Sequence, residues 1–97
     1  MTMDKKIKIK INNQLPFLKK RYHVKKMGVF GSVARAEAGE NSDIDILVEF
    51  NAPIGLFDFI ELEDCLSKKL HKKVDLVSKK ALKPAIKKDI LTEVIYV

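Results

Sequence analysis

The chain has 97 residues, 46% of them hydrophobic and 33% charged, and it carries a formal net charge of +6. This length and composition predict one globular domain over residues 1–97 and exclude a disordered chain. The sequence has no long uncharged apolar run and no signal-peptide core, which excludes a membrane-spanning or secreted protein from our expectations. The positive charge suits an anionic partner such as a nucleotide, RNA or an acidic protein.

The cysteine content indicates the compartment. Cys65 is the single cysteine in the sequence, so it cannot form an internal disulfide, and we expect a cytoplasmic protein. The residue falls in a stretch with helical periodicity. We therefore expect Cys65 to be a small buried helix residue with no chemical role.

The first elements are a helix and a strand. Leu15, Leu18 and Tyr22 have helical spacing, which predicts a helix over residues 13–22. The stretch 6–11 alternates lysine and isoleucine, a period typical of a strand, so periodicity alone leaves its structure open. His23 would end the helix and is not expected to be catalytic.

Two apolar runs predict the central strands. The first covers residues 24–30 and the second residues 44–50. Between them, Ser32 is a suitable N-cap for a short helix that would end at about residue 36. Residues 37–42 have the Gly, Glu, Asn and Ser content of a loop.

Polar residues at the facing ends of these two strands suggest a binding site. Gly31 and Ser32 follow the first strand, where a small turn with N–H and hydroxyl donors suits a phosphate. Asp43 and Asp45 open the second strand and would share one face, because side chains alternate along a strand. Adjacent carboxylates repel unless a proton or cation lies between them, and Mg²⁺ prefers oxygen ligands. The pattern predicts a site for Mg²⁺ and a nucleoside triphosphate.

The second half of the chain predicts a helix, a strand, a helix and a final strand. Leu56, Leu62 and other apolar residues form one stripe over residues 56–70, and acids near its start match the helix dipole. We interpret these acids as helix surface: Asp58, Glu61, Glu63 and Asp64. A short strand over 74–77 contains Asp75, a helix begins at Pro84 and continues to residue 92, and residues 94–97 form an edge strand.

The motif resembles a known family. Gly-Ser-Val-Ala-Arg at residues 31–35 and Ser-Asp-Ile-Asp-Ile-Leu-Val at residues 42–48 are similar to the signature of the DNA polymerase β-type nucleotidyltransferases. The short chain resembles the minimal nucleotidyltransferases (MNT), which pair with HEPN-domain proteins. This resemblance implies an α+β nucleotidyltransferase fold, a small mixed β-sheet with helices packed against it. It also favours a helix before residue 24.

The resemblance assigns a role to each matching residue. It implies that Gly31 and Ser32 grip the triphosphate, and that Asp43 and Asp45 hold two Mg²⁺ ions. Asp75 matches the third carboxylate of the family, which binds a metal and helps to deprotonate the attacking hydroxyl.

Two flanking positions complete the expected nucleotide site. Arg35 matches the family arginine, and Ser42 precedes the first aspartate of the motif, so both are candidates for nucleotide binding. The family has glycine after the arginine, whereas this chain has Ala36. Alanine would be strained there if φ is positive and harmless if the position is helical.

The implied function is Mg²⁺-dependent transfer of AMP from ATP to a hydroxyl of a protein, as the antitoxin of a HEPN/MNT toxin–antitoxin pair. The alternative is a weakly catalytic nucleotide-binding subunit that inhibits a HEPN ribonuclease by contact. Transfer to a small molecule, as in aminoglycoside nucleotidyltransferases, would need an extra helical domain. A basic RNA-binding module would leave the three aspartates unexplained, so direct nucleic-acid binding is not expected.

Overall fold

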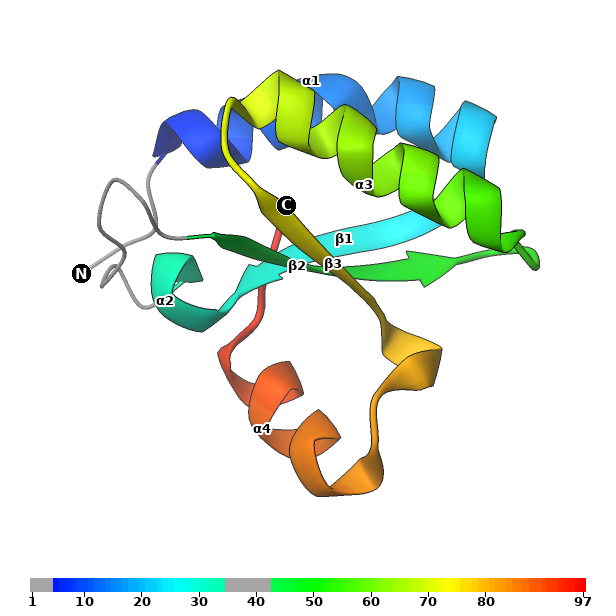
Figure 1. The fold of residues 1–97 in the computed structure, drawn as a ribbon. Coiled ribbons are helices and arrows are strands. Elements are labelled where there is room, and N and C mark those ends of the chain that lie inside the picture. Colours follow the sequence, from blue (N-terminus) through cyan, green and yellow to red (C-terminus); the bar gives the residue numbers. More distant parts are fainter. Residues whose placement is uncertain (1–4, 35–42) are drawn as a thin grey trace.

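The structure is a computed structural model that describes residues 5–34 and 43–97. Its helices and strands alternate along most of the chain (Figure 1). Their bounds are α1 Lys5–Tyr22, β1 Val24–Phe30, α2 Gly31–Ala34, β2 Ile44–Phe50, α3 Leu56–Leu70, β3 Val74–Ser78, a 3-10 helix Lys79–Ala81, α4 Pro84–Glu93 and β4 Ile95–Tyr96.

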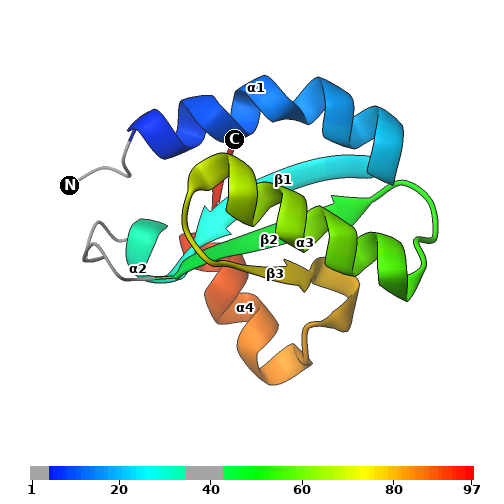
Figure 2. The same cartoon turned by 45° about the horizontal axis from the view of Figure 1, so that its top comes forward.

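The four strands form one mixed sheet in the order β3-β2-β1-β4. Strand β1 runs antiparallel to both β2 and β4, whereas β2 and β3 are parallel and are joined through α3. Helices α1 and α3 lie side by side over one face of the sheet, and α4 lies on the opposite side (Figures 1 and 2). The prediction of a mixed sheet with helices packed against it is confirmed.

The hydrophobic core lies between the sheet and the pair α1 and α3. Alternate residues of β2 point into it, and Ile44, Ile46 and Val48 are fully buried there. Leu62 and Leu66 of α3 meet them from above, as the helical stripe predicts. Strand alternation and helix periodicity therefore bury the same core, and the polar residues of β2 remain on the other face.

Helix α1 settles the open question at the N-terminal end. It is continuous over Lys5–Tyr22 and contains Pro16, so the helix begins earlier than residue 13. Ile7 and Ile11 are one helical turn apart and both contact the core, whereas Ile9 is 57% exposed. The alternating lysines and isoleucines thus supply a helical face. The helix that the family resemblance favours before residue 24 is confirmed, and the strand that the alternation left open does not form.

Other local predictions need correction. The predicted apolar stripe of α3 does not bury its first residue, because Leu56 is 70% exposed. Cys65 is half-buried rather than fully buried. Ser32 lies within the first turn of α2, which begins at Gly31, so it is not the N-cap.

Two acidic residues of α3 accept hydrogen bonds from neighbouring elements, one from α1 and one from β3. Glu61 accepts a hydrogen bond from the Tyr22 hydroxyl at 2.8 Å, which joins α3 to α1. Glu63 accepts a hydrogen bond from the backbone N–H of Leu76 at 2.9 Å and so satisfies one donor on the outer edge of β3. The sequence interpretation of these two acids as helix surface was therefore incomplete.

No helix within residues 5–34 and 43–97 combines the length and the apolar character that a membrane-spanning segment requires.

Candidate nucleotide and metal site

The structure places the three predicted aspartates on neighbouring chain segments. Asp45 of β2 and Asp75 of β3 are direct partners in the parallel register. Paired residues of adjacent strands project to the same face, so both carboxylates lie on the face opposite α1 and α3. Asp43 precedes β2 by one residue and is exposed, as is Asp75. The predicted acids therefore lie at one end of the β2–β3 pair.

Gly31 begins the turn after β1 and lies against the carboxylate of Asp45. Its φ is +73°, a left-handed conformation that side chains rarely adopt. A Cβ atom at this position would collide with Oδ2 of Asp45. Glycine is thus required twice, by the backbone conformation and by the carboxylate packed against it. The two halves of the predicted site, the Gly-Ser turn and the aspartate strand, are in direct contact.

The backbone N–H of Gly31 already has a protein partner. It donates a 2.9 Å hydrogen bond to Oε1 of Glu93, the last residue of α4. We expected Gly31 to offer this donor to a phosphate. In the structure Gly31 supplies space and conformation, and Ser32, half-buried within α2, is the predicted phosphate-binding residue beside it.

Arg35, Ser42 and Ala36 lie outside the described residues. Their predicted roles, and the question whether alanine is strained at position 36, stay predictions.

The carboxylates suit a hard divalent cation by type, because Mg²⁺ prefers oxygen ligands. Because Gly31 has no side chain, there is room beside it for the Asp45 carboxylate. Within residues 5–34 and 43–97, however, no three His, Cys, Asp or Glu side chains are gathered closely enough to hold one ion. Asp43 has a cationic neighbour, since its Oδ2 lies 3.9 Å from Nζ of Lys73 and both side chains are exposed. The ligand types fit, and the side chains are not gathered around a common point.

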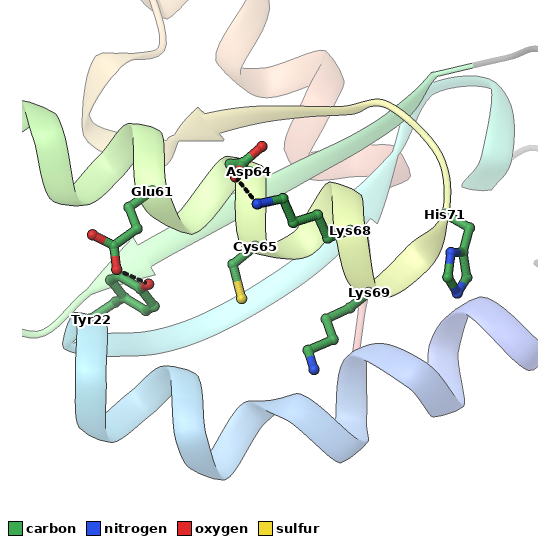
Figure 3. Close-up of a pocket in the computed structure, with 7 residues that line it drawn as sticks. All are labelled: Tyr22, Glu61, Asp64, Cys65, Lys68, Lys69 and His71. Atoms are coloured by element: carbon green, nitrogen blue, oxygen red, sulfur yellow. Dashed lines mark hydrogen bonds and ion pairs between the residues drawn. The ribbon is translucent and has the colours of Figure 1, made fainter.

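A surface pocket of about 560 Å³ lies apart from these aspartates, beside α1 and α3. Figure 3 shows Tyr22 and Glu61 directed toward each other at one end, and Lys69 and His71 at the other. Burial and the hydrogen bond to Glu61 raise the pKa of Tyr22 to about 12. This pocket lies on the helical side of the sheet, so it does not belong to the candidate site.

Known proteins match most of the chain. Residues 11–97 match the nucleotidyltransferase domain family. The chain belongs to this family. The predicted enzyme class, nucleotidyltransferase, is thereby confirmed. The protein adenylyltransferase MntA of Thermococcus cleftensis is 51% identical over 80 residues, which cover 82% of this chain and 81% of that protein.

Solved structures agree with this membership. A structure assigned as a minimal nucleotidyltransferase has a TM-score of 0.82 and 34% identity, and covers 98% of this chain and 95% of that one. The resemblance to the minimal nucleotidyltransferases is confirmed. An MNT antitoxin of Shewanella oneidensis, in complex with a tri-AMPylated HEPN toxin, has a TM-score of 0.67 at 21% identity. The match covers 93% of this nucleotidyltransferase and 70% of that chain, and at this identity it shows the shared fold.

Glu93 is the site neighbour that the sequence analysis missed. A negative charge in the last turn of a helix is opposed by the helix dipole, and the last turn of α4 contains no basic residue. That mismatch is a signal that Glu93 needs a partner. The sequence could not name Gly31 as that partner, because the two residues are 62 positions apart.

Proposed function

We propose that this nucleotidyltransferase transfers AMP from ATP to a hydroxyl group of a protein, with Mg²⁺ bound by Asp43, Asp45 and Asp75. The observation that carries the proposal is the pairing of Asp45 with Asp75 on parallel strands, with Asp45 packed against the Gly31–Ser32 turn. This arrangement supports the proposal, because it sets Asp45, one of the three carboxylates proposed to bind Mg²⁺, next to the turn that the family resemblance assigns to the triphosphate.

Bound Mg²⁺ would neutralise charge on the triphosphate and on these carboxylates. The exposed side chains of Asp43 and Asp75 can change rotamer quickly, so they can turn toward a cation shared with Asp45. Asp43 would exchange its distant contact with Lys73 for the cation.

The reaction would be an in-line displacement at the α-phosphorus. The acceptor hydroxyl oxygen forms the new bond to phosphorus, the bond to the bridging oxygen breaks, and pyrophosphate leaves. Asp75 would accept the hydroxyl proton, and Ser32 would hold the triphosphate by its hydroxyl and backbone. The protein contributes positioning and charge stabilisation, with no covalent enzyme intermediate.

The acceptor is proposed to be a HEPN-type ribonuclease that this chain inhibits as its antitoxin. The Thermococcus relative is a protein adenylyltransferase, and the Shewanella neighbour is an MNT antitoxin bound to an AMPylated HEPN toxin. Exposure of Asp43 and Asp75 leaves the candidate site accessible to a protein hydroxyl. A net charge of +6 would also speed encounter with an acidic or RNA-associated partner.

The test is intact-mass spectrometry of such a HEPN protein after incubation with ATP, Mg²⁺ and this chain. We expect the mass to rise by one or more AMP units and RNA cleavage to fall. The Asp43→Ala/Asp45→Ala variant should cause neither change. Equal inhibition of cleavage by both proteins with no mass change would contradict the enzymatic proposal and support inhibition by contact.

A further inference from the structure

The C-terminal end of α4 reaches the candidate site through one side chain. Oε1 of Glu93 accepts the backbone N–H of Gly31 at 2.9 Å in a partly buried setting. The carboxylate is unfavourable at the end of α4, because the helix dipole is negative there. A charge-assisted hydrogen bond to a backbone N–H offsets this cost. The position of Glu93 therefore fits a bond to the turn better than a helix-surface role.

The final strand fixes where Glu93 lies. Immediately after it, Val94 packs over Gly28 of β1, where a Cβ atom would lie only 2.5 Å from the valine Cγ2. Ile95 and Tyr96 then pair with β1 in antiparallel register. Two residue pairs between β4 and β1 and a close side-chain contact thus anchor the residues that follow the carboxylate. The bond to Gly31 is held by the sheet itself.

The Gly31–Ser32 turn needs such an anchor. Gly31 has a positive φ and no side chain, so its own conformational preferences do not select one geometry. Glu93 accepts a hydrogen bond from the Gly31 N–H, while Asp45 occupies the space where a Cβ of residue 31 would lie. The carboxylate of α4 and the carboxylate of β2 thus contact the same glycine in different ways, and only Asp45 belongs to the proposed metal site.

We propose that Glu93 is a positioning residue, which holds the Gly31–Ser32 turn in the geometry that binds the triphosphate of ATP. It acts through the Gly31 peptide and does not itself touch the nucleotide. The inference rests on the proposed function, because it takes this turn as the triphosphate-binding element.

Three variants of the full chain and one control variant test the role. Glu93→Gln keeps an oxygen that accepts the Gly31 N–H, and Glu93→Ala removes the acceptor. Val94→Ala weakens the same junction and leaves the carboxylate in place. Asp89→Ala removes another acid of α4, an exposed one, and serves as the control for net charge. Each protein is measured by hydrogen exchange of the Gly31 amide and by calorimetry of ATP binding with Mg²⁺.

We expect Glu93→Ala to lose protection of the Gly31 amide and to weaken ATP binding about tenfold, the size typical of one hydrogen bond to a charged group. Glu93→Gln should keep the amide protected and stay within about twofold of the original affinity, as should Asp89→Ala. Val94→Ala should lower the thermal midpoint with little change in affinity. This pattern would separate positioning of the turn from general stability.

Three results would overturn the inference. An unchanged affinity in Glu93→Ala, despite loss of amide protection, would reduce Glu93 to a structural residue. Equal losses of affinity and stability in Glu93→Ala and Val94→Ala would do the same. Tighter ATP binding by Glu93→Ala would show that the carboxylate competes with phosphate for the Gly31 N–H. If the original chain binds no ATP while Gly31 is protected by Glu93, the proposed function fails and the hydrogen bond stands.

Discussion

The two faces of the sheet are built differently. Toward α1 and α3, alternate residues of β2 are fully buried, and a hydrogen bond between Tyr22 and Glu61 joins the helices above them. Toward α4, the same strand presents Asp45, Leu47 and Glu49, of which only Leu47 is fully buried, and α4 contributes no buried residue. One set of side chains of this strand thus faces the hydrophobic core, and the other set carries two acids on either side of the buried Leu47.

This difference separates stability from chemistry. Apolar burial between the sheet and two long helices supplies the main stabilising term, because it scales with the area removed from water. The charged face can then carry repelling carboxylates, which are unfavourable for folding unless a cation or donor compensates them. Substitutions on the two faces should therefore have different kinds of effect, and the following predictions test that separation.

The largest effect is expected on the charged face. Asp45→Asn should lower the rate of AMP transfer on the order of 10³-fold, because it removes charge from the proposed metal site and the developing phosphate charge loses its counterion. Glu49→Gln is a matched control on the same strand and face, where Glu49 pairs with Lys79 at 3.4 Å. Single-turnover transfer rates should separate the two variants, and equal rates would remove Asp45 from the site.

A core truncation should lower stability, whereas the Asp45 variant is expected to lower the rate of AMP transfer. Leu66 is 1% exposed in α3, so Leu66→Ala should lower the free energy of unfolding by about 2–5 kcal/mol through lost burial and a cavity. Ile86 of α4 is 49% exposed, and Ile86→Ala should cost less than about 1 kcal/mol. Urea denaturation measures both. Similar losses would mean that α4 contributes as much to the core as α3 does.

The hydrogen bond between Tyr22 and Glu61 predicts a pH dependence on the helical face. The folded pKa of Tyr22 is raised to about 12 from the ordinary value of 10.0, chiefly by burial. The resulting stabilisation is complete below pH 10 and is lost as the pH rises through 12, where the unfolded chain releases the proton more readily. The loss should be about 2 kcal/mol.

Denaturation between pH 9 and 12 checks this dependence. Tyr22→Phe should show a flatter profile, since the buried hydroxyl is gone. Tyr96→Phe is the control, because Tyr96 lies in β4 and not beside Glu61. This variant should lose stability at high pH as the original chain does. Parallel profiles for the original chain and Tyr22→Phe would assign the dependence to other groups.

The change in stability expected at the turn is smaller than that of the core truncation. Gly31→Ala should cost about 1–2 kcal/mol, because alanine is strained at a φ of +73° and its Cβ would displace the Asp45 carboxylate. The same displacement should weaken ATP binding. Gly55→Ala is the control, since a Cβ there would meet no heavy atom within 4 Å. Thermal unfolding and ATP calorimetry of the two variants test the turn, and equal results would contradict its special geometry.

The periodicity of apolar residues predicted most of the helices and strands, because burying one face of a helix or strand requires apolar residues at regular intervals. The strands at 24–30 and 44–50 and the helix at 56–70 appear with the predicted bounds. Periodicity was misleading near the N-terminus, where apolar residues alternate with lysines but the chain forms a helix. Ile7, Ile9 and Ile11 read as one side of a strand, yet Ile7 and Ile11 lie on one face of α1 and Ile9 on another.

The candidate site was only partly predictable. The strand pattern gave Asp43 and Asp45 a common face, and the pairing of Asp45 with Asp75 required the parallel register that forms through α3. The contact between Gly31 and Asp45 depends on a backbone angle that no local pattern specifies. The bond from Gly31 to Glu93 depends on the course of the whole chain.

The antiparallel pairing of β4 with β1 has a consequence for synthesis. β1 is complete after about a third of the chain has been made, but its outer edge pairs with Ile95 and Tyr96, and the turn at its end bonds Glu93. While the ribosome still covers these late residues, the nascent chain can bury α1 against β1 and β2 but has an open strand edge. The turn that we propose to bind the triphosphate can therefore reach its final geometry only after residue 96 has left the exit tunnel, so a chain that terminates before Glu93 should bind ATP more weakly.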